Sequence, residues 1–215
     1  MKPYLVKMPK FVQWLFPKRI WAFSSNTDTV YLTFDDGPIP EVTPWVLSEL
    51  KKHNAHATFF CIGDNINKYP SIFQQIIAEG HSVGNHTCHH INGSKTEASA
   101  YVQNVLKAEE TIQSNLPNSQ KSNMLFRPPY GKLTSKQAKL LQQQGYKIIM
   151  WDVLSADFDT RISEEKCLQN VIKNIRPGSI LIFHDSLKAE KNLRYALPKV
   201  LEFLAEKKWN CKPIL

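Results

Sequence analysis

The sequence predicts an α/β fold, a (β/α) barrel of about seven parallel strands in a single domain. Short apolar stretches alternate with longer stretches whose apolar residues recur at helical spacing, and this alternation is typical of parallel β/α units. A chain of 215 residues, 42% of them hydrophobic, has the size and apolar content of one domain. An open doubly wound sheet is the rival architecture, but no Gly-x-Gly-x-x-Gly turn follows the first apolar stretch to support it.

The expected strands are short apolar runs bounded by turn residues. They cover residues 30–34, 57–62, 82–84, 124–126, 146–151, 179–183 and 209–214. The expected helices carry apolar residues on one face and begin or end at residues that favour helix termini. They cover residues 43–53, 70–78, 97–114, 135–145, 163–176 and 193–207. Pro44 lies at a first helical position, Ser135 and Ser163 are candidate caps, and Gly80 and Gly145 follow helix ends.

The formal net charge of +8 suits an acidic partner such as nucleic acid, anionic lipid or anionic glycan. The lysines and arginines are scattered, however, and the sequence holds no nucleic-acid-binding motif, so a nucleic-acid partner is not expected. The cysteines lie far apart, without the paired spacings of a zinc ribbon or a redox motif, and are expected to be free thiols. They are Cys61, Cys88, Cys167 and Cys211.

Residues 1–28 are expected to form an N-terminal extension that packs on the catalytic domain of residues 29–215. No stretch approaches the roughly 20 apolar residues of a membrane span. Pro17 ends the apolar run of residues 11–16 before any cleavage site, so no cleavable signal peptide is predicted, which favours a cytoplasmic location and leaves cell-envelope association open. Alternatively, basic and aromatic residues of the extension could contact a membrane surface. They are Lys7, Lys10, Lys18, Arg19, Trp14, Phe16 and Trp21.

Two adjacent carboxylates, Asp35 and Asp36, follow the first predicted strand and precede a Gly-Pro turn. Side-by-side acids repel each other, so both stay ionised at neutral pH only if a metal ion or an arginine neutralises at least one of them. A solvated turn in which one acid caps the next helix is the simpler alternative. The rest of the sequence argues against that alternative, because other reactive residues also follow predicted strands.

These further residues are His86 and His90, Arg127, Asp152 or Asp157, and His184. In a parallel barrel the carboxyl ends of the strands converge on one face, and barrel enzymes build their active sites there from residues of several strands. We therefore expect these side chains to meet at one site.

His86 and His90 are four residues apart, so on a helical turn their imidazoles would point the same way and reach one ion. Together with Asp36 they make a two-histidine, one-carboxylate set that leaves room for water, as expected of a catalytic metal. His89 should face elsewhere. Cys88 should point to the other side and is not expected to be a ligand. A polar loop without a metal is the alternative.

Four stretches of the chain match, in order, four of the five signature motifs of the polysaccharide deacetylase family, also described as the chitooligosaccharide deacetylase homology domain. They are residues 33–38 (TFDDGP), 86–90 (HTCHH), 127–131 (RPPYG) and 182–184 (IFH). The chain resembles this family from about residue 29 to about residue 186. The resemblance implies a distorted (β/α) barrel with one divalent metal, most often Zn²⁺, with Co²⁺, Ni²⁺ or Mn²⁺ as alternatives. It also implies removal of acetyl groups from N-acetylated sugars or O-acetylated xylan.

By this resemblance Asp35 is the expected general base, Asp36 a metal ligand beside His86 and His90, and His184 the general acid. Such groups activate a water molecule and protonate the departing amine. Arg127 resembles the residue that orients the base, and the Tyr130 N–H resembles an oxyanion donor. The expected substrate-binding residues are Pro129, Tyr130, Phe158 and Ile182, the last in a small apolar pocket for the acetyl methyl group.

The fourth motif departs from the family pattern, which is Asp-x-x-Asp-Trp. Here Leu154 replaces the first acid and Phe158 the tryptophan, while Asp157 keeps the second acid and could pair with Arg127 or His184. We expect this change in the fourth motif to affect the substrate pocket more than the reaction. Asp152 and Asp185 are nearby spare carboxylates, expected to be structural.

Two other functions stay open at this point. A glycan-binding pseudoenzyme would explain the altered fourth motif. A non-haem iron oxygenase would use the same two-histidine, one-carboxylate set, although such enzymes normally have antiparallel barrels and need neither a free base nor an acid. The glycan itself is not specified by the sequence: peptidoglycan, chitin fragments, another envelope glycan or a soluble sugar precursor carry the same acetamide.

Overall fold

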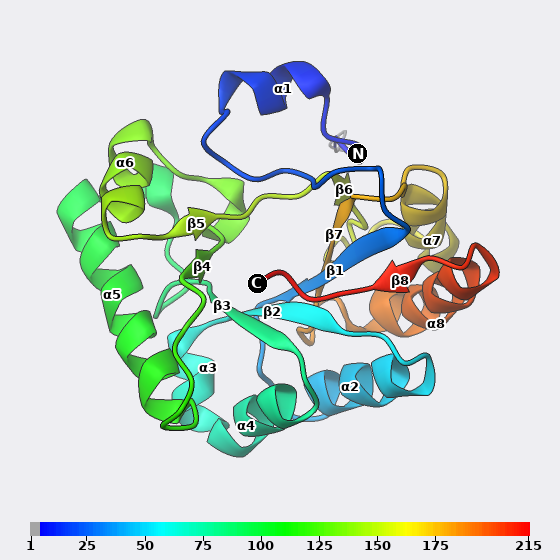
Figure 1. Ribbon diagram of the computed structural model, residues 1–215, viewed down its shortest axis with the longest axis horizontal. Helices are drawn as coiled ribbons and strands as arrows, with labels where there is room; N and C mark the ends of the chain where they lie inside the picture. Colours follow the sequence, from blue (N-terminus) through cyan, green and yellow to red (C-terminus); the bar gives the residue numbers. More distant parts are fainter. Residues whose placement is uncertain (1–4) are drawn as a thin grey trace.

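A parallel sheet that curls into an incomplete barrel, with helices on its outside, forms the body of the protein (Figure 1). The computed structural model describes residues 5–215, so the first four residues of the expected extension lie outside the described part. The strands are β1 Thr29–Asp35, β2 Ala57–Cys61, β3 Ser82–Asn85, β4 Leu125–Phe126, β5 Lys147–Ile148, β6 Val153–Leu154, β7 Ile180–His184 and β8 Asn210–Cys211. Seven of them follow the order β5-β4-β3-β2-β1-β7-β6, and β8 pairs with β1 off this path. The prediction of a distorted barrel of about seven parallel strands is confirmed.

The strand register brings the carboxyl ends together. Asp35, the last residue of β1, is level with Phe60 of β2 on one side and with His184 of β7 on the other. Asn85 at the end of β3 is level with Phe126 at the end of β4. The residues that follow β1, β3, β4 and β7 therefore start from one edge of the barrel.

Each predicted helical stretch holds a helix, and two further short helices, α1 and α3, were not predicted. The helices are α1 Lys10–Leu15, α2 Val42–Lys52, α3 Gly63–Lys68, α4 Pro70–Ala78, α5 Ala98–Asn115, α6 Ser135–Gln143, α7 Glu164–Ile172 and α8 Glu190–Glu206, with 3-10 turns η1 Gly93–Lys95 and η2 Pro129–Gly131. The expected cap Ser135 is wrong by one residue. Thr134 caps α6, because its hydroxyl accepts the Gln137 N–H while the Gln137 side chain accepts the Thr134 N–H, a capping box.

The strand predicted for residues 146–151 is shorter in the structure, because only Lys147–Ile148 forms β5, and β6 at Val153–Leu154 was not predicted. The chain forms β5 and then β6, which lie at opposite ends of the sheet path. The N-terminal segment fills the seam between them: the Ile20 N–H donates to the Ile148 carbonyl, and the Met150 N–H donates to the Ile20 carbonyl. Farther along, the Met8 N–H donates to Asp152 and the Leu154 N–H to Val6, each at 2.8 Å. Because these partners are distant in sequence, the break was invisible in the local apolar pattern.

The main core lies between the sheet and its surrounding helices, with Phe34 stacked between Phe59 and Phe183. A separate apolar cluster that includes Phe60 and Ile214 packs near the C-terminal tail, which runs to the middle of the barrel in Figure 1. All four cysteines are free thiols, as predicted. Within residues 5–215 no helix is both long enough and apolar enough to cross a membrane.

Candidate metal centre and active site

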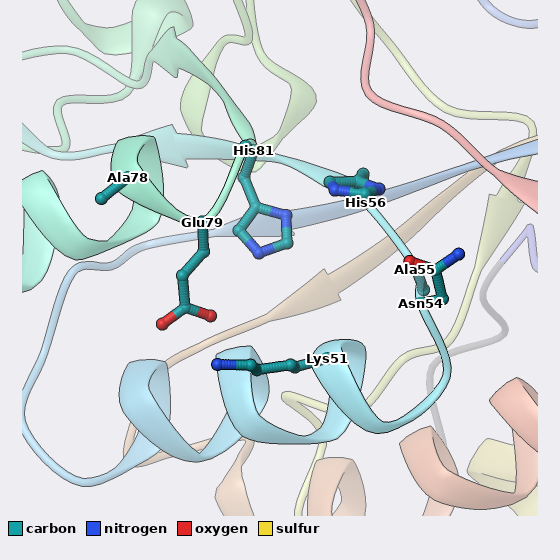
Figure 2. A pocket seen from close by; sticks show the side chains of 8 residues that line it. Lys51, Asn54, Ala55, His56, Ala78, Glu79 and His81 are labelled. Atoms are coloured by element: carbon teal, nitrogen blue, oxygen red, sulfur yellow. The ribbon is translucent and has the colours of Figure 1, made fainter.

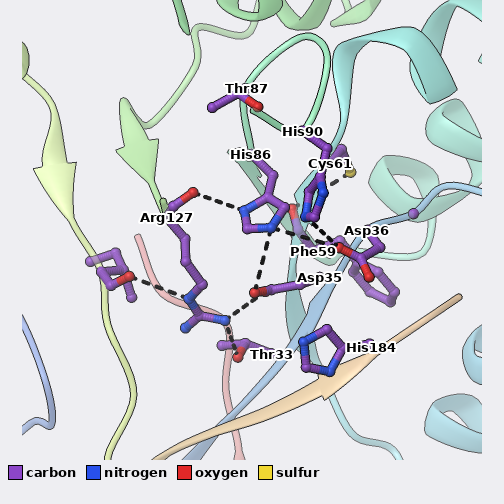
Figure 3. Close-up of polar contacts among 12 residues, drawn as sticks. Thr33, Asp35, Asp36, Phe59, Cys61, His86, Thr87, His90, Arg127 and His184 are labelled. Carbon is purple, nitrogen blue, oxygen red and sulfur yellow. Dashed lines mark hydrogen bonds and ion pairs between the residues drawn. The ribbon is translucent and has the colours of Figure 1, made fainter. Parts of the chain in front are cut away.

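The predicted carboxylates Asp35 and Asp36 lie near the predicted histidines and Arg127 at the carboxyl ends of the strands (Figure 3). Asp35 and Asp36 come from the end of β1, His86 and His90 follow β3, and His184 ends β7. These five side chains border a cavity of about 560 Å³. Its other lining residues are Pro128, Tyr130, Gly131, Trp151, Leu154, Phe158, Ile182, Ser186 and Lys188.

Asp36, His86 and His90 form a group that could hold a metal ion. The Asp36 Oδ1 atom lies 3.2 Å from His90 Nε2 and 3.7 Å from His86 Nε2. In a tetrahedral zinc site with bonds of about 2.0–2.1 Å, neighbouring ligand atoms are about 3.3 Å apart. The group therefore fits a divalent ion in size and in donor type.

The environment keeps His86 and Asp36 in the protonation states that a metal needs. His86 Nδ1 lies 2.8 Å from the Arg127 carbonyl oxygen and donates to it, which leaves the Nε2 lone pair free. Burial lowers the pKa of His86 to about 4, so the imidazole is neutral. Burial works to raise the pKa of Asp36, but the hydrogen bond from His90 and the nearby imidazoles hold it well below its usual value.

The loop of residues 86–90 is not a helical turn, so the geometric reason given for the histidine pair is wrong although the pair itself converges. Thr87 and His90 have φ angles of 64° and 51°, in the left-handed region. The loop is held by side chains: the Thr87 N–H donates to Asn85 Oδ1 and the Cys88 N–H to Asn104 Oδ1, each at 2.9 Å. The prediction that His89 faces away from the other two histidines is confirmed, since its Nδ1 pairs with the half-buried Asp64 carboxylate at 2.7 Å.

Asp185, which follows the neighbouring strand β7, holds the turn at Asp35 and Asp36 in place. Asp185 Oδ1 accepts the Gly37 N–H at 3.1 Å, and its Oδ2 accepts the Thr43 hydroxyl at 2.6 Å. Burial raises the pKa of Asp185 to about 8, so the carboxyl group is mostly neutral at pH 7. Asp185 is thus a structural residue, as expected from the sequence.

Arg127 is fully buried and holds Asp35. Its Nη1 lies 2.7 Å from Asp35 Oδ1, and its other donors reach the Thr33 hydroxyl and the carbonyls of Ile149 and Met150. The guanidinium also lies over the Phe60 ring, 4.1 Å from the centroid. Arg127 therefore fixes the carboxylate from behind and does not line the cavity.

Asp157 pairs with His184 rather than with Arg127. Its Oδ1 lies 2.8 Å from His184 Nδ1, and its Oδ2 accepts the His184 backbone N–H at 2.7 Å. Burial works to lower the pKa of His184, but the Asp157 carboxylate overcomes it and raises the pKa to about 9. The imidazole is therefore protonated at neutral pH.

The substrate side of the cavity differs in part from the expectation. Tyr130, Phe158 and Ile182 line it, but Pro129 does not, and the neighbouring Pro128 takes that place. The sequence reasoning missed Trp151, Gly131, Ser186 and Lys188 and noted Leu154 only as a lost acid. Leu154 forms an apolar cluster with Ala156 and Ile182. Trp151 was the last residue of a predicted strand and Gly131 belonged to the RPPYG motif, whereas the only signal for Ser186 and Lys188 was their position shortly after a predicted strand.

A second cavity, of about 410 Å³, lies at the amino ends of β2 and β3, where His56 and His81 precede these strands (Figure 2). His81 Nδ1 accepts the Ala57 N–H at 3.2 Å, and burial lowers the pKa of His81 to about 4. In residues 5–215 no group of three potential metal ligands lies at this cavity. The imidazole is a neutral bridge between the two strand starts.

A second potential ligand group, Asp64, Cys88 and His89, lies beside the first. His89 is already paired with Asp64, and the Lys107 ammonium lies 3.4 Å from His89 Nε2. Burial raises the pKa of the Cys88 thiol. A nearby cation and a protonated thiol both oppose metal binding there.

Comparison with known proteins gives one family. The model of the polysaccharide deacetylase family matches residues 24–149. A peptidoglycan-N-acetylglucosamine deacetylase of Bacillus cereus (strain ATCC 14579) is 39% identical over 171 residues, which cover 79% of this chain and 61% of that protein. A chitooligosaccharide deacetylase of Bradyrhizobium sp. (strain ANU 289) is 36% identical, covering 83% of this chain and 80% of its own length. The chain thus spans less than two thirds of the Bacillus cereus relative.

Solved structures of proteins named as deacetylases or CE4 family members are also similar to this chain. A peptidoglycan N-acetylglucosamine deacetylase in complex with a naphthalenyl N-oxidanyl-benzamide superposes with a TM-score of 0.85 at 30% identity, covering 100% of this chain and 95% of that one. A CE4 family pseudoenzyme from Bacillus anthracis superposes with a TM-score of 0.81 at 26% identity, covering 91% of this chain and 67% of that one. The fold, the motifs and the relatives lead to one assignment: this chain belongs to the polysaccharide deacetylase family.

Proposed function

We propose that this protein is a metal-dependent hydrolase that removes acetyl groups from N-acetylated sugars of an oligosaccharide or polysaccharide. The observation that carries the proposal is the pairing of two reactive groups with buried partners around one set of metal ligands. Asp35 is held by Arg127, and His184 is held by Asp157, on the same cavity that Asp36, His86 and His90 border. A sugar-binding surface without chemistry needs none of these buried charges.

Asp36, His86 and His90 would hold one divalent ion, with Zn²⁺ favoured by the nitrogen and oxygen donors and Co²⁺, Ni²⁺ or Mn²⁺ as alternatives. Such an ion supplies Lewis acidity, which polarises a carbonyl group and makes water a better nucleophile. The neutral state of His86 and the fixed direction of its Nε2 support this role.

Asp35 acts as the general base. It accepts a proton from the water whose oxygen attacks the acetamide carbonyl carbon, and Arg127 keeps its carboxylate oriented. His184 acts as the general acid: it gives its proton to the sugar nitrogen while the carbon–nitrogen bond breaks, so that acetate and a free amine leave. The raised pKa of His184 supports this role, because the proton donor must be charged before the amine departs.

The acetyl group fits the apolar side of the cavity. Leu154 and Ile182 are neighbours on β6 and β7, and Trp151 and Phe158 pack against them. The Tyr130 N–H is the proposed oxyanion donor, and the exposed Tyr130 ring offers a face for a sugar. The proposed partner is therefore a carbohydrate that carries N-acetyl groups.

Two alternatives have specific observations behind them. The pseudoenzyme among the structural neighbours and the loss of the acid at Leu154 favour a glycan-binding protein without activity. The paired base and acid argue for the enzyme. An iron oxygenase is disfavoured because the sheet is parallel and because a held base and acid have no part in that chemistry.

The test is acetate release by the metal-reconstituted full chain from a panel of chitooligosaccharides, peptidoglycan fragments and acetylated xylan. We expect turnover under anaerobic conditions with Zn²⁺ or Co²⁺ and its loss in Asp35→Asn. No acetate from any substrate, with metal bound, would support the pseudoenzyme. Turnover that requires oxygen would support the oxygenase.

A further inference from the structure

Helix α1 exposes an unusual apolar surface. Among the described residues, five of the eight exposed large hydrophobic side chains belong to one stretch of the N-terminal segment. They are Leu5, Phe11, Trp14, Leu15 and Phe16, with exposed fractions of 58%, 64%, 81%, 61% and 37%. We call these five residues the α1 surface. Exposed apolar side chains concentrated in one short segment indicate a binding surface rather than scattered exposure.

The direction of these side chains follows from helix geometry. Phe11, Trp14 and Leu15 are at positions i, i+3 and i+4 of α1, so they share one face of the helix. Val12 and Met8 pack inward on the cluster around Trp21 and Phe126. The helix thus already covers the core with its other side, and the α1 surface has no packing role there.

The segment is held firmly at both ends. Before α1, Val6 and Met8 exchange backbone hydrogen bonds with Leu154 and Asp152, and Lys7 pairs with the Asp152 carboxylate. After α1, Ile20 bonds to Ile148 and Met150. In Figure 1 the helix stands outside the barrel at the seam between β5 and β6. The α1 surface is therefore presented by a fixed part of the fold and not by a loose tail.

Positive charge predominates around this surface. Residues 5–27 contain four cations and no Asp or Glu, and residues 111–151, which include α6, contain no Asp or Glu either. The two segments meet in a groove that Leu15, Phe16, Lys18 and Arg19 line together with Lys139 of α6. Lysines that are scattered in the sequence are thus gathered by the fold around exposed aromatic and aliphatic side chains.

We infer that the α1 surface docks the protein on an anionic lipid bilayer. Aromatic and leucine side chains enter the boundary between headgroups and acyl chains, and lysines at their edge attract anionic headgroups. A polysaccharide would use the ring of Trp14, but Leu5 and Leu15 offer a sugar no stacking face. The inference is independent of the proposed reaction, because none of these residues lines the catalytic cavity.

The test is co-sedimentation of the full chain with vesicles of phosphatidylcholine alone and of phosphatidylcholine mixed with phosphatidylglycerol. We expect the wild type to bind the mixed vesicles only. The triple variant Phe11→Ser, Trp14→Ser, Leu15→Ser should bind them with at least about tenfold weaker affinity. The variants Lys10→Gln and Lys18→Gln, and the wild type in high salt, should also bind the mixed vesicles more weakly. Leu215→Ser, which removes another exposed leucine, is the matched control and should bind like the wild type. Lipids brominated in their acyl chains should quench the fluorescence of the wild type more than that of Trp14→Ser.

The variants should keep the thermal stability of the wild type, since the replaced side chains are exposed. No binding to mixed vesicles, or equal binding by the triple variant, would overturn the inference. Two further results would overturn it in favour of another occupant. One is a dimer in solution that the triple variant abolishes while vesicles bind nothing. The other is retention on an anionic polysaccharide, without vesicle binding, that depends on the same three residues.

Discussion

The Asp157 carboxylate accepts two hydrogen bonds from His184, one from the ring Nδ1 at 2.8 Å and one from the backbone N–H at 2.7 Å. A single buried acid therefore sets both the position and the charge of the imidazole. The His184 ring borders the same cavity as the metal-ligand group. Asp157, the acid that the altered fourth motif retains, therefore acts on the proposed general acid.

Asp157→Asn should move the alkaline limb of the pH–rate profile to lower pH. The amide keeps a hydrogen-bond acceptor but loses the charge that overcomes burial, so the pKa of His184 falls from about 9 toward its ordinary value of 6.5 or below. If it reaches 6.5, the protonated fraction near pH 8 drops about thirtyfold, and kcat/KM drops with it. Ser155→Ala removes a neutral contact to Asp157 and should leave the limb in place. If the alkaline limb of the pH–rate profile does not move in Asp157→Asn, His184 is not the general acid.

Asp185→Asn should flatten the pH dependence of stability. The folded carboxyl stays protonated up to about pH 8, whereas in the unfolded chain it ionises near 3.8, so unfolding releases a proton between these values. The wild-type free energy of unfolding should therefore fall as pH rises from about 4 to about 8, and the variant should lose this part of the slope. Urea unfolding of the metal-free proteins at several pH values measures it. Asp185→Ala should cost about 1–3 kcal/mol at all pH values, because the Gly37 N–H loses its acceptor.

The sequence predicted much of the fold and of the site because both depend on strand ends. Apolar runs identify strands, and in a parallel sheet the residues that follow them must share one edge. That reasoning brought Asp35, Asp36, Arg127 and His184 together without any knowledge of distances. It also paired His86 with His90, although the loop reaches that geometry through left-handed residues rather than a helical turn.

The remaining features depend on contacts between distant parts of the chain. The break between β5 and β6 exists because Ile20 and Met8 bond to the intervening backbone, and nothing local in residues 146–154 marks it. Trp151 and Leu154 resemble ordinary core residues, and their place in the cavity follows only from the barrel's curvature. The choice of Asp157 between Arg127 and His184 likewise needed three-dimensional positions, because either pairing satisfies a buried acid.

Removing the proposed base and removing a proposed ligand should have different effects on metal content. Asp35→Asn should keep the metal and lose turnover by at least about a hundredfold, because the carboxylate is held by Arg127 and is not in the ligand group. His86→Ala should lose both, with affinity reduced more than about a hundredfold. Metal analysis after dialysis against a chelator measures it, with His89→Ala as the control that keeps the metal. Equal metal loss in Asp35→Asn and His86→Ala would reverse the roles of the two acids.

Leu154→Ala should widen the choice of acyl group. Leu154 and Ile182 are level on adjacent strands and both are almost fully buried, so truncating one opens space beside the other. We expect the ratio of kcat/KM for an N-propionyl sugar over the N-acetyl sugar to rise about tenfold, since one methylene group in an apolar pocket is worth at least that much. The substitution should also destabilise the fold by about 2–5 kcal/mol. Leu168→Ala is a matched control, because Leu168 has the same 7% exposure but lies in the main core. It should lower stability and leave the ratio unchanged. A ratio that changes equally in both variants would mean that Leu154 acts through stability alone and that the acetyl group binds elsewhere.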